Sequence, residues 1–262
     1  GGPFANIAQG TNSILATRMG LSLSDYVVTE AGFGADLGSE KFMNIKCGYA
    51  GLKPHALVLV ATIRALRHHG GAKKAAYNTP DLEKVKAGFE NLEKHIENCR
   101  KFGLTPVVAI NHFETDSQDE ISFVQQRCEQ LGVKAILSKG WSQGGDGMKE
   151  IAETVVENIE SGVNQFKALY DWKIPVEEKI RTIATEIYGA DDVEYSSKAR
   201  TQLKTIKSLG FDNLPICMAK TQKSLSDNES KVGRPRNFSV TVREFEFAAG
   251  AGFIVPILGD IM

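Results

Sequence analysis

Residues 106–137 read PVVAINHFETDSQDEISFVQQRCEQLGVKAIL, and this stretch decides the fold class. The apolar run at 106–111 predicts a strand that is buried on both faces. Asp116 or Ser117 can cap the helix that follows, and a short apolar run at 133–137 predicts a second strand. A strand, a helix and another strand in this order indicate a parallel βαβ unit.

The same alternation extends to both sides of this stretch. Residues 56–62 predict another strand buried on both faces, and 81–102 has the apolar spacing of a long amphipathic helix. Residues 166–209 are predicted to be mostly helical. Further helices are expected over 6–23, 39–50 and 148–161, and further strands over 26–29, 214–219, 238–247 and 253–258. The sequence therefore predicts an α/β fold with mostly parallel sheets, flanked by helices and arranged in two lobes.

The composition is that of an ordinary folded protein: of 262 residues, 42% are hydrophobic and 24% are charged. With a net charge of -1, no overall field draws the chain to nucleic acid or to an anionic membrane. No apolar run reaches the roughly 18 residues that a membrane-spanning helix needs. The four cysteines form no CxxC pair, so neither a zinc site nor a thioredoxin-type motif is indicated. We expect reduced thiols and a cytoplasmic protein.

A glycine-rich loop follows the strand expected at 26–29. Residues 32–38 read GFGADLG, and three glycines in seven residues indicate a sharply bent backbone or a close approach to another group. Loops at the carboxyl ends of buried strands are where open α/β sheets bind ligands. Phe33 lies between two of these glycines and is either a plug for the core or a stacking surface for a planar ligand.

Of four familiar motifs, three are absent from the sequence. The dinucleotide fingerprint G-x-G-x-x-G is missed by one residue at 32–38, which disfavours a nicotinamide-dependent oxidoreductase. The phosphate-binding motif G-x-x-x-x-G-K-[ST] is absent from the sequence, and the pattern G-x-S-x-G occurs once, as GWSQG at 140–144. His68 and His69 are adjacent rather than three or four residues apart, so they do not make a helical metal pair, and no protein metal site is expected.

Three aromatic residues follow predicted strands: Phe33, Phe113 and Trp141. If the strands are parallel neighbours, the three loops gather at one edge of the sheet. Two rings that face each other across a cleft can hold a flat heteroaromatic ligand, and each stacked pair contributes ~0.5–1.5 kcal/mol beyond the area that it buries. The alternative is that the three rings are unrelated anchors in the core.

Several long stretches resemble the formate–tetrahydrofolate ligase (10-formyltetrahydrofolate synthetase) family. The matching runs, in chain order, are GGPFANIAQG, VVTEAGFGADLGSEKF, VATIRALRHHGG, VVAINHFETD, WSQGGDG, MAKTQKSLSD and GAGFIVPILGDIM. They cover essentially the whole chain, as the middle-to-late portion of such a ligase. The sequence departs from the family pattern at Gln9, where the family usually has His, and at Arg67, where it usually has Lys.

The resemblance implies an ATP-dependent ligase of one-carbon metabolism that joins formate to tetrahydrofolate through formyl phosphate, with Mg²⁺ arriving together with ATP. It also implies a P-loop NTPase-like parent fold, with residues 1–95 as the remainder of the nucleotide and catalytic domain and 96–262 as a second α/β domain. The first residues contain no Met and the last ones follow an apolar run, so we expect an internal piece that lacks the phosphate loop and is inactive alone.

The resemblance also implies the roles of particular residues. Two aromatic rings sandwich the pterin ring and a third lies beside it: these are Phe113, Trp141 and Phe33. The catalytic centre is expected at Glu30, Gly32 and Gly34. The nucleotide is expected near Lys220, Ser224, Arg234 and Pro235.

The expected partners are small molecules, namely formate, ATP and tetrahydrofolate, without nucleic acid or membrane. A homo-oligomer is expected for the full-length protein. The alternative function is a non-catalytic module that keeps a pterin cleft.

Overall fold

The computed structural model describes residues 10–32 and 34–259, and it groups the chain into two compact units. The first unit comprises residues 1–53, 168–231 and 235–262, as far as they are described, and the second comprises 54–167 and 232–234. Residues 95 and 96 both lie within one helix of the second unit, and the expected domain boundary between them stays a prediction.

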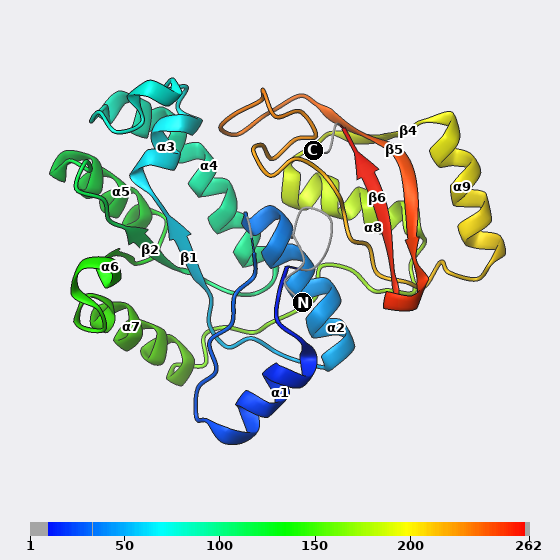
Figure 1. The fold of residues 1–262 in the computed structure, drawn as a ribbon, viewed down its shortest axis with the longest axis horizontal. Helices are drawn as coiled ribbons and strands as arrows, with labels where there is room; N and C mark the ends of the chain where they lie inside the picture. The colour runs from blue at the N-terminus through cyan, green and yellow to red at the C-terminus, as the bar shows by residue number, and fades with distance from the viewer. Residues whose placement is uncertain (1–9, 33, 260–262) are drawn as a thin grey trace. The chain divides into compact units, whose positions relative to one another are not determined.

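The second unit contains a parallel sheet of three strands in the order β1-β2-β3. Its strands are β1 (Val58–Ala61), β2 (Val107–Asn111) and β3 (Ala135–Ser138), and both neighbouring pairs are parallel. The chain crosses from β1 to β2 through α3 (Ile63–His69), η3 (Lys74–Ala76) and α4 (Leu82–Lys101), and from β2 to β3 through α5 (Gln118–Gln130) (Figure 1). The predicted α/β class is therefore confirmed; a P-loop NTPase-like parent fold stays a prediction.

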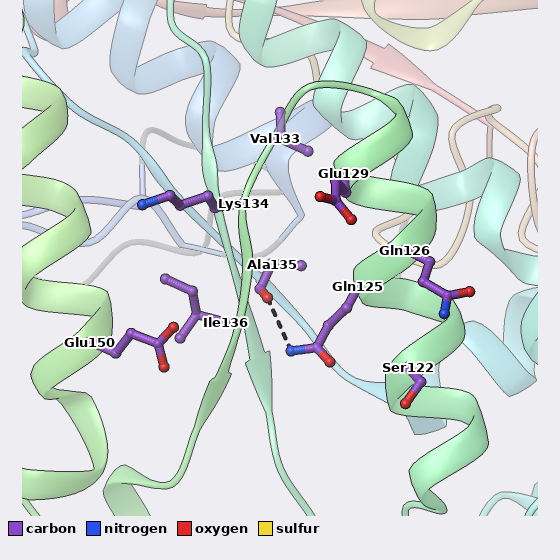
Figure 2. A pocket seen from close by; sticks show the side chains of 9 residues that line it. All are labelled: Ser122, Gln125, Gln126, Glu129, Val133, Lys134, Ala135, Ile136 and Glu150. Atoms are coloured by element: carbon purple, nitrogen blue, oxygen red, sulfur yellow. Dashed lines mark hydrogen bonds between the residues drawn. The ribbon is translucent and has the colours of Figure 1, made fainter.

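Helices cover both faces of this sheet. After β3 the chain forms α6 (Gly140–Gln143), η4 (Asp146–Met148) and α7 (Lys149–Glu160). In Figure 2, α5 and α7 lie on opposite sides of β3. Ser117 is the cap of α5: its hydroxyl accepts from the Glu120 backbone N–H, and the Glu120 carboxylate accepts from the Ser117 N–H in return. Of the two predicted caps, Ser117 fills the position, because Asp116 is used in the preceding turn.

One burial prediction for this sheet is wrong. Strand β2 is buried on both faces, as expected, but in β1 only Leu59 and Ala61 are buried. Val58 is 42% exposed and Val60 64% exposed. Exposed and buried residues alternate along β1, so in the described part of the chain only one of its faces is covered, and an unbroken apolar run cannot reveal that difference.

The first unit contains a mixed sheet in the order β4-β5-β6. β4 (Asp192–Tyr195) runs parallel to β5 (Ser239–Ala248), which is antiparallel to β6 (Phe253–Leu258), with the short η6 (Ala249–Ala251) between the last two. Segment 166–209 is thus less helical than predicted, because it includes β4 and because 166–175 contains no helix.

The strand predicted at 214–219 is reduced to two isolated parallel bridges to β6. Ile254 donates to Pro215 O and accepts from the Cys217 N–H, and Ala219 donates to Pro256 O. Pro256 has no N–H to return to the segment, so the ladder is interrupted between the two bridges.

Helices of the first unit differ from the expected ones at their boundaries. α1 (Ile14–Leu23) starts at its cap Ser13, later than the helix predicted from residue 6, of which residues 6–9 lie outside the described part. The helix predicted at 39–50 is a succession of η1 (Ala35–Ser39), η2 (Phe42–Lys46) and α2 (Cys47–Ala50), and the first two have π-helical turns. The remaining helical elements are α8 (Val176–Thr182), η5 (Ile183–Tyr188) and α9 (Ser197–Ser208).

The strand predicted at 26–29 is wrong. These residues have no regular secondary structure, Val28 is 95% exposed, and they pair with no strand in the described part of the chain. A short run such as YVVT cannot by itself specify a strand, because a strand also needs a neighbour that satisfies its backbone groups.

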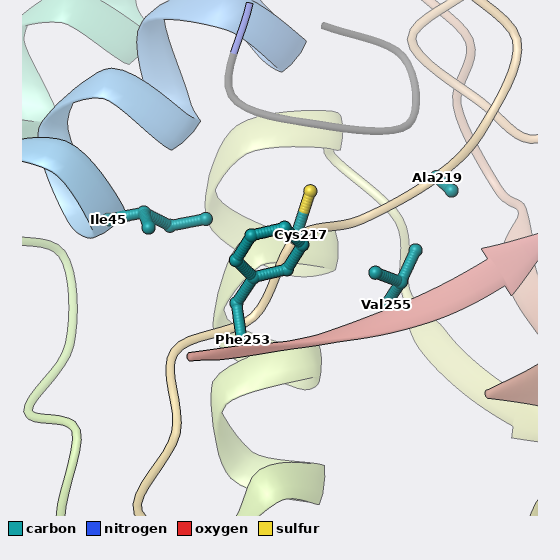
Figure 3. Close-up of a cluster of buried hydrophobic side chains, with 5 residues drawn as sticks. All are labelled: Ile45, Cys217, Ala219, Phe253 and Val255. Carbon is teal, nitrogen blue, oxygen red and sulfur yellow. The ribbon is translucent and has the colours of Figure 1, made fainter. Parts of the chain in front are cut away.

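The core of the first unit joins the helical segment to the sheet. Ile45 packs with Cys217, Ala219, Phe253 and Val255 (Figure 3). All four cysteines are buried, and none of them forms a disulfide in the described part of the chain.

Candidate functional site

Two of the predicted folate residues follow neighbouring strands of the second unit. Asn111, the last residue of β2, pairs with Ser138, the last residue of β3, and the His112 N–H donates to Ser138 O at 3.1 Å. Phe113 and Trp141 therefore leave the same edge of the sheet from paired positions. This is the carboxyl edge, where parallel sheets bind their ligands.

The turn that carries Phe113 is closed on itself. Asp116 Oδ2 accepts from the Phe113 N–H at 2.9 Å, and the Asp116 N–H donates to Phe113 O at 2.9 Å. The ring is half-buried, and the Arg64 guanidinium lies over it, 5.0 Å from its centroid. Burial raises the pKa of Asp116, although the Phe113 N–H and Arg67 act to lower it.

A buried ion pair between Arg67 and Glu120 stabilises this turn. Arg67 is fully buried and donates to both oxygens of Glu120, at 2.8 and 2.6 Å. The same guanidinium donates to Tyr77 O at 2.7 Å and to Thr115 O at 2.9 Å. Burial opposes ionisation of Glu120, but hydrogen bonds from Arg67 and the α5 cap outweigh it and lower the pKa of Glu120 to about 2. Arg67 therefore fixes both the start of α5 and the loop that precedes it.

Whereas the Phe113 ring is half-buried, Trp141 is 94% exposed. It lies in α6, whose loop is closed by a hydrogen bond from the Lys139 N–H to Gly147 O at 3.1 Å. A Cβ at Gly147 would come within 2.5 Å of the Lys139 carbonyl, so only glycine allows this closure. A rigid loop that presents a whole indole to solvent is suited to covering a flat ligand.

The structure thus brings the loops of Phe113 and Trp141 to one edge, and the pterin sandwich itself stays a prediction. Phe33 lies outside the described residues. The strand expected before Phe33, at 26–29, is not formed, and the expectation that its ring joins the other two at one sheet edge stays a prediction.

The glycine loop belongs to the first unit and folds back tightly. The Gly32 N–H donates to Gly10 O at 2.8 Å, and a Cβ at Gly38 would lie 1.7 Å from Gly32 O. Gly34 caps η1, and Glu30 is exposed. The close approach explains why Gly38 must be glycine. Catalytic roles for Glu30, Gly32 and Gly34 stay predictions.

A buried ion pair holds the end of this loop. Lys220 is fully buried, and its ammonium lies 2.7 Å from Asp36 Oδ2. It also donates to Thr221 O at 3.0 Å and to Ser224 O at 2.5 Å. The Ser224 hydroxyl in turn donates to Lys231 O at 2.5 Å. Lys220 and Ser224, two of the four residues expected near the nucleotide, are therefore engaged within the protein. Their nucleotide role stays a prediction.

Glu40 is a second buried acid in this region. Its Oε1 accepts from the Asn44 amide at 2.8 Å, whereas Oε2 accepts no hydrogen bond in the described part of the chain. Burial is the largest influence and raises the pKa of Glu40 to about 7, against the opposing influence of Asn44 and Lys41. Such a perturbed carboxyl is a feature of functional sites as well as of buried ion networks.

Arg234 and Pro235, the other expected nucleotide neighbours, follow Gly233, which belongs to the second unit. Arg234 makes two hydrogen bonds of 2.8 Å to the Glu97 carboxylate, and the Asn91 amide donates to Gly233 O at 2.8 Å. The Gly233 N–H meets His69 Nδ1 at 3.0 Å. Arg234 is thus held by an acid of α4, and Pro235 is half-buried.

Sequence reasoning missed the buried charges that hold these loops. Arg67 attracted notice only as a departure from a family pattern, and Arg64, Glu120, Asp36 and Glu40 gave no signal as site residues. A charged residue in a helix is usually solvated, so its burial becomes visible only when the partners from distant segments are known.

A hollow of about 350 Å³ lies elsewhere in the second unit, beside the amino end of β3. Figure 2 shows its lining between α5 and α7, where the Gln125 amide donates to Ala135 O at 3.3 Å. None of the predicted site residues lines it.

Within residues 10–32 and 34–259, no three His, Cys, Asp or Glu side chains lie close enough together to hold a metal ion. No helix in this part of the chain combines the length and the apolar character needed to cross a membrane.

A parallel sheet of three strands with helices on both faces defines an α/β protein. Comparison with known families narrows this class. The family model described as formate–tetrahydrofolate ligase matches residues 1–262, the whole chain. The chain belongs to the formate–tetrahydrofolate ligase family.

Proposed function

We propose that the chain supplies the folate-binding surface of a ligase that uses ATP to join formate to tetrahydrofolate. The observation that carries this proposal is the full-length family match, combined with the placement of Phe113 and Trp141 after paired strand ends. In this reaction ATP phosphorylates formate to formyl phosphate and releases ADP. The N10 amine of tetrahydrofolate then attacks the formyl carbon, loses its proton and expels phosphate, which gives 10-formyltetrahydrofolate.

The protein's contribution to such chemistry is chiefly to position the reactants and to exclude water from a labile acyl phosphate. Phe113 and Trp141 stack against the two faces of the pterin ring and thereby orient the N10 amine, which a methylene group joins to that ring. Gly32 and Gly34 let the backbone approach the reacting centre closely, and the exposed Glu30 carboxylate takes up the proton that the amine loses.

The nucleotide is proposed to lie beside Lys220, Ser224, Arg234 and Pro235. Within the protein, Lys220 pairs with Asp36, Ser224 donates to Lys231 O, and Arg234 bonds to Glu97. Mg²⁺ is proposed to arrive with ATP, because this strongly hydrated cation is usually bound through substrate phosphates and only one or two carboxylates.

The folate proposal is tested by titrating tetrahydrofolate while following tryptophan fluorescence. The exposed Trp141 gives the response, and Trp141→Ala removes it and weakens binding. Trp172→Phe is the control, because the Trp172 indole is tied to Asn44 O at 3.1 Å within the first unit. A response that survives Trp141→Ala unchanged would contradict the proposal.

We also propose that this 262-residue chain does not turn over by itself, because it contains no G-x-x-x-x-G-K-[ST] motif. The measurement is formate-dependent release of ADP by the purified chain. Binding of tetrahydrofolate without ADP release is the expected result, and sustained ADP release would show the proposal to be wrong.

A further inference from the structure

Arg64 has no role in the function proposed above, yet its side chain touches the folate site. Its guanidinium carbon lies 5.0 Å from the centroid of the Phe113 ring. Arg64 is half-buried, and no carboxylate lies within ion-pair distance of it among the described residues. The Arg64 guanidinium therefore interacts with the face of the Phe113 ring.

The strand order gives this contact a direction. Arg64 follows β1, Phe113 follows β2 and Trp141 follows β3, and the three parallel strands are neighbours in that order. Phe113 therefore emerges between the other two. The Arg64 guanidinium approaches the Phe113 ring from the β1 side and covers one of its faces. The other face is then open toward β3, the strand that Trp141 follows.

We propose that Arg64 is a positioning residue of the folate site, which holds the Phe113 ring ready to stack against the pterin. This inference rests on the proposed function. The attraction between a cation and the negative face of a ring favours one orientation of Phe113, so less freedom is lost when the substrate binds.

The size of the effect follows from the exposure of the pair. A partly exposed cation–π contact changes an equilibrium by about two- to fivefold. Arg64→Met keeps an apolar side chain of similar length without the charge and should weaken tetrahydrofolate binding by that factor. Arg64→Lys keeps a cation over the ring and should restore most of the affinity.

The chain offers a matched control in Arg127, whose guanidinium lies 5.5 Å from the centroid of the Phe89 ring. That pair joins α5 to α4 in the same unit and is not part of the carboxyl edge. Arg127→Met should leave tetrahydrofolate affinity unchanged. An equal loss in both variants would overturn the proposal, because it would show a general effect on the fold.

A second ligand separates positioning from direct binding. Tetrahydrofolate carries a glutamate tail, whereas a 6-methyltetrahydropterin has the same bicyclic ring without carboxylates. If Arg64 acts through Phe113, Arg64→Met weakens both ligands by the same factor. A loss confined to tetrahydrofolate would overturn the proposal and make Arg64 a ligand of the tail.

The contact itself is tested by NMR without any ligand. The side-chain protons of Arg64 should show a ring-current shift to high field that disappears in Phe113→Ala. Absence of that shift would overturn the proposed contact. If the shift is present but the wild-type chain binds neither ligand, the proposed function fails while the contact stands.

Discussion

Glu40 is a carboxyl group in an environment that disfavours its charge. It is fully buried, and the groups that act on it are Asn44, Lys41 and Asp36. One of its oxygens accepts no hydrogen bond in the described part of the chain, and a neutral carboxyl tolerates this far better than an ion does. The residue lies directly after η1 and the glycine loop, so its protonation is coupled to the packing of that region.

The first prediction follows from the direction of this shift. The pKa of Glu40 is about 7 in the folded chain, above the ordinary 4.5, so the folded state holds a proton that the unfolded state releases between these values. The free energy of unfolding should therefore fall as the pH rises from about 4.5 to about 7, by on the order of 3 kcal/mol.

Urea unfolding at several pH values measures this decline. Glu40→Gln removes the titrating group and keeps the bond to Asn44, so its stability should change much less in the same window. A Gln variant with the same decline as the wild-type chain would assign the pH dependence to another group.

The second prediction concerns the pair of Asp36 and Lys220. Removing one partner leaves the other charge buried and uncompensated, which typically costs about 3–5 kcal/mol. Lys220→Met and Asp36→Asn should each destabilise the chain strongly, and the double variant should lose less than the sum of the two. A double-mutant cycle in urea gives the coupling energy.

A neighbouring exposed pair is the control for that cycle. Lys223 and Glu229 lie 2.7 Å apart with side chains 45% and 57% exposed, so Lys223→Met should cost less than about 1 kcal/mol. If Lys220 instead serves mainly as a phosphate ligand, Lys220→Met will leave stability intact, and strictly additive effects will exclude a coupled pair.

At the level of elements, α5 and the turn before it depend on one buried network. Arg67 joins the α5 capping box to the loop ending at Thr115, and the next residue, Asp116, closes the turn of Phe113. The short range of a cap would ordinarily fix only the first turn of a helix. Here the buried guanidinium extends that order into the loop that carries the aromatic ring.

The third prediction is that Arg67→Met destabilises the chain by about 3–5 kcal/mol, because it leaves the Glu120 carboxylate buried without its main donor. The pKa of Glu120 is about 2 in the folded state and ordinarily 4.5. Its contribution to the free energy of unfolding should therefore be complete above about pH 4.5 and be lost as the pH falls towards 2.

Chemical unfolding of the variants measures both effects. The control is Lys134→Met, because Lys134 and Glu157 form an exposed ion pair of 3.3 Å in the same unit. Its loss should stay below about 1 kcal/mol. Equal losses for Arg67→Met and Lys134→Met would contradict the role assigned to the buried pair.

Elements that carry their own local signals could be predicted from the sequence. The strand at 107–111, the α5 helix with its cap and the glycine-rich loops all have such signals. The strand predictions for 26–29 and 214–219 were not met because a strand depends on its partners. Residues 26–29 pair with no strand in the described chain, and Pro256 interrupts the pairing of 214–219. Exposure of Val60 likewise depends on which face of β1 other elements cover.

At the scale of the whole molecule, the α/β class and the family followed from the sequence, because periodicity and long matching runs survive without coordinates. The candidate site followed only in part. That the loops of Phe113 and Trp141 leave one sheet edge could be predicted from their place after strands, whereas Arg64 and the buried ion pairs involve segments that only the fold brings together.

The central claim is that one pterin ring stacks between Phe113 and Trp141, and a crystal structure of the chain with tetrahydrofolate tests it most directly. We predict density for the bicyclic ring between the two side chains, with the indole of Trp141 largely removed from solvent. A pterin bound elsewhere, with Trp141 still exposed, would contradict the account.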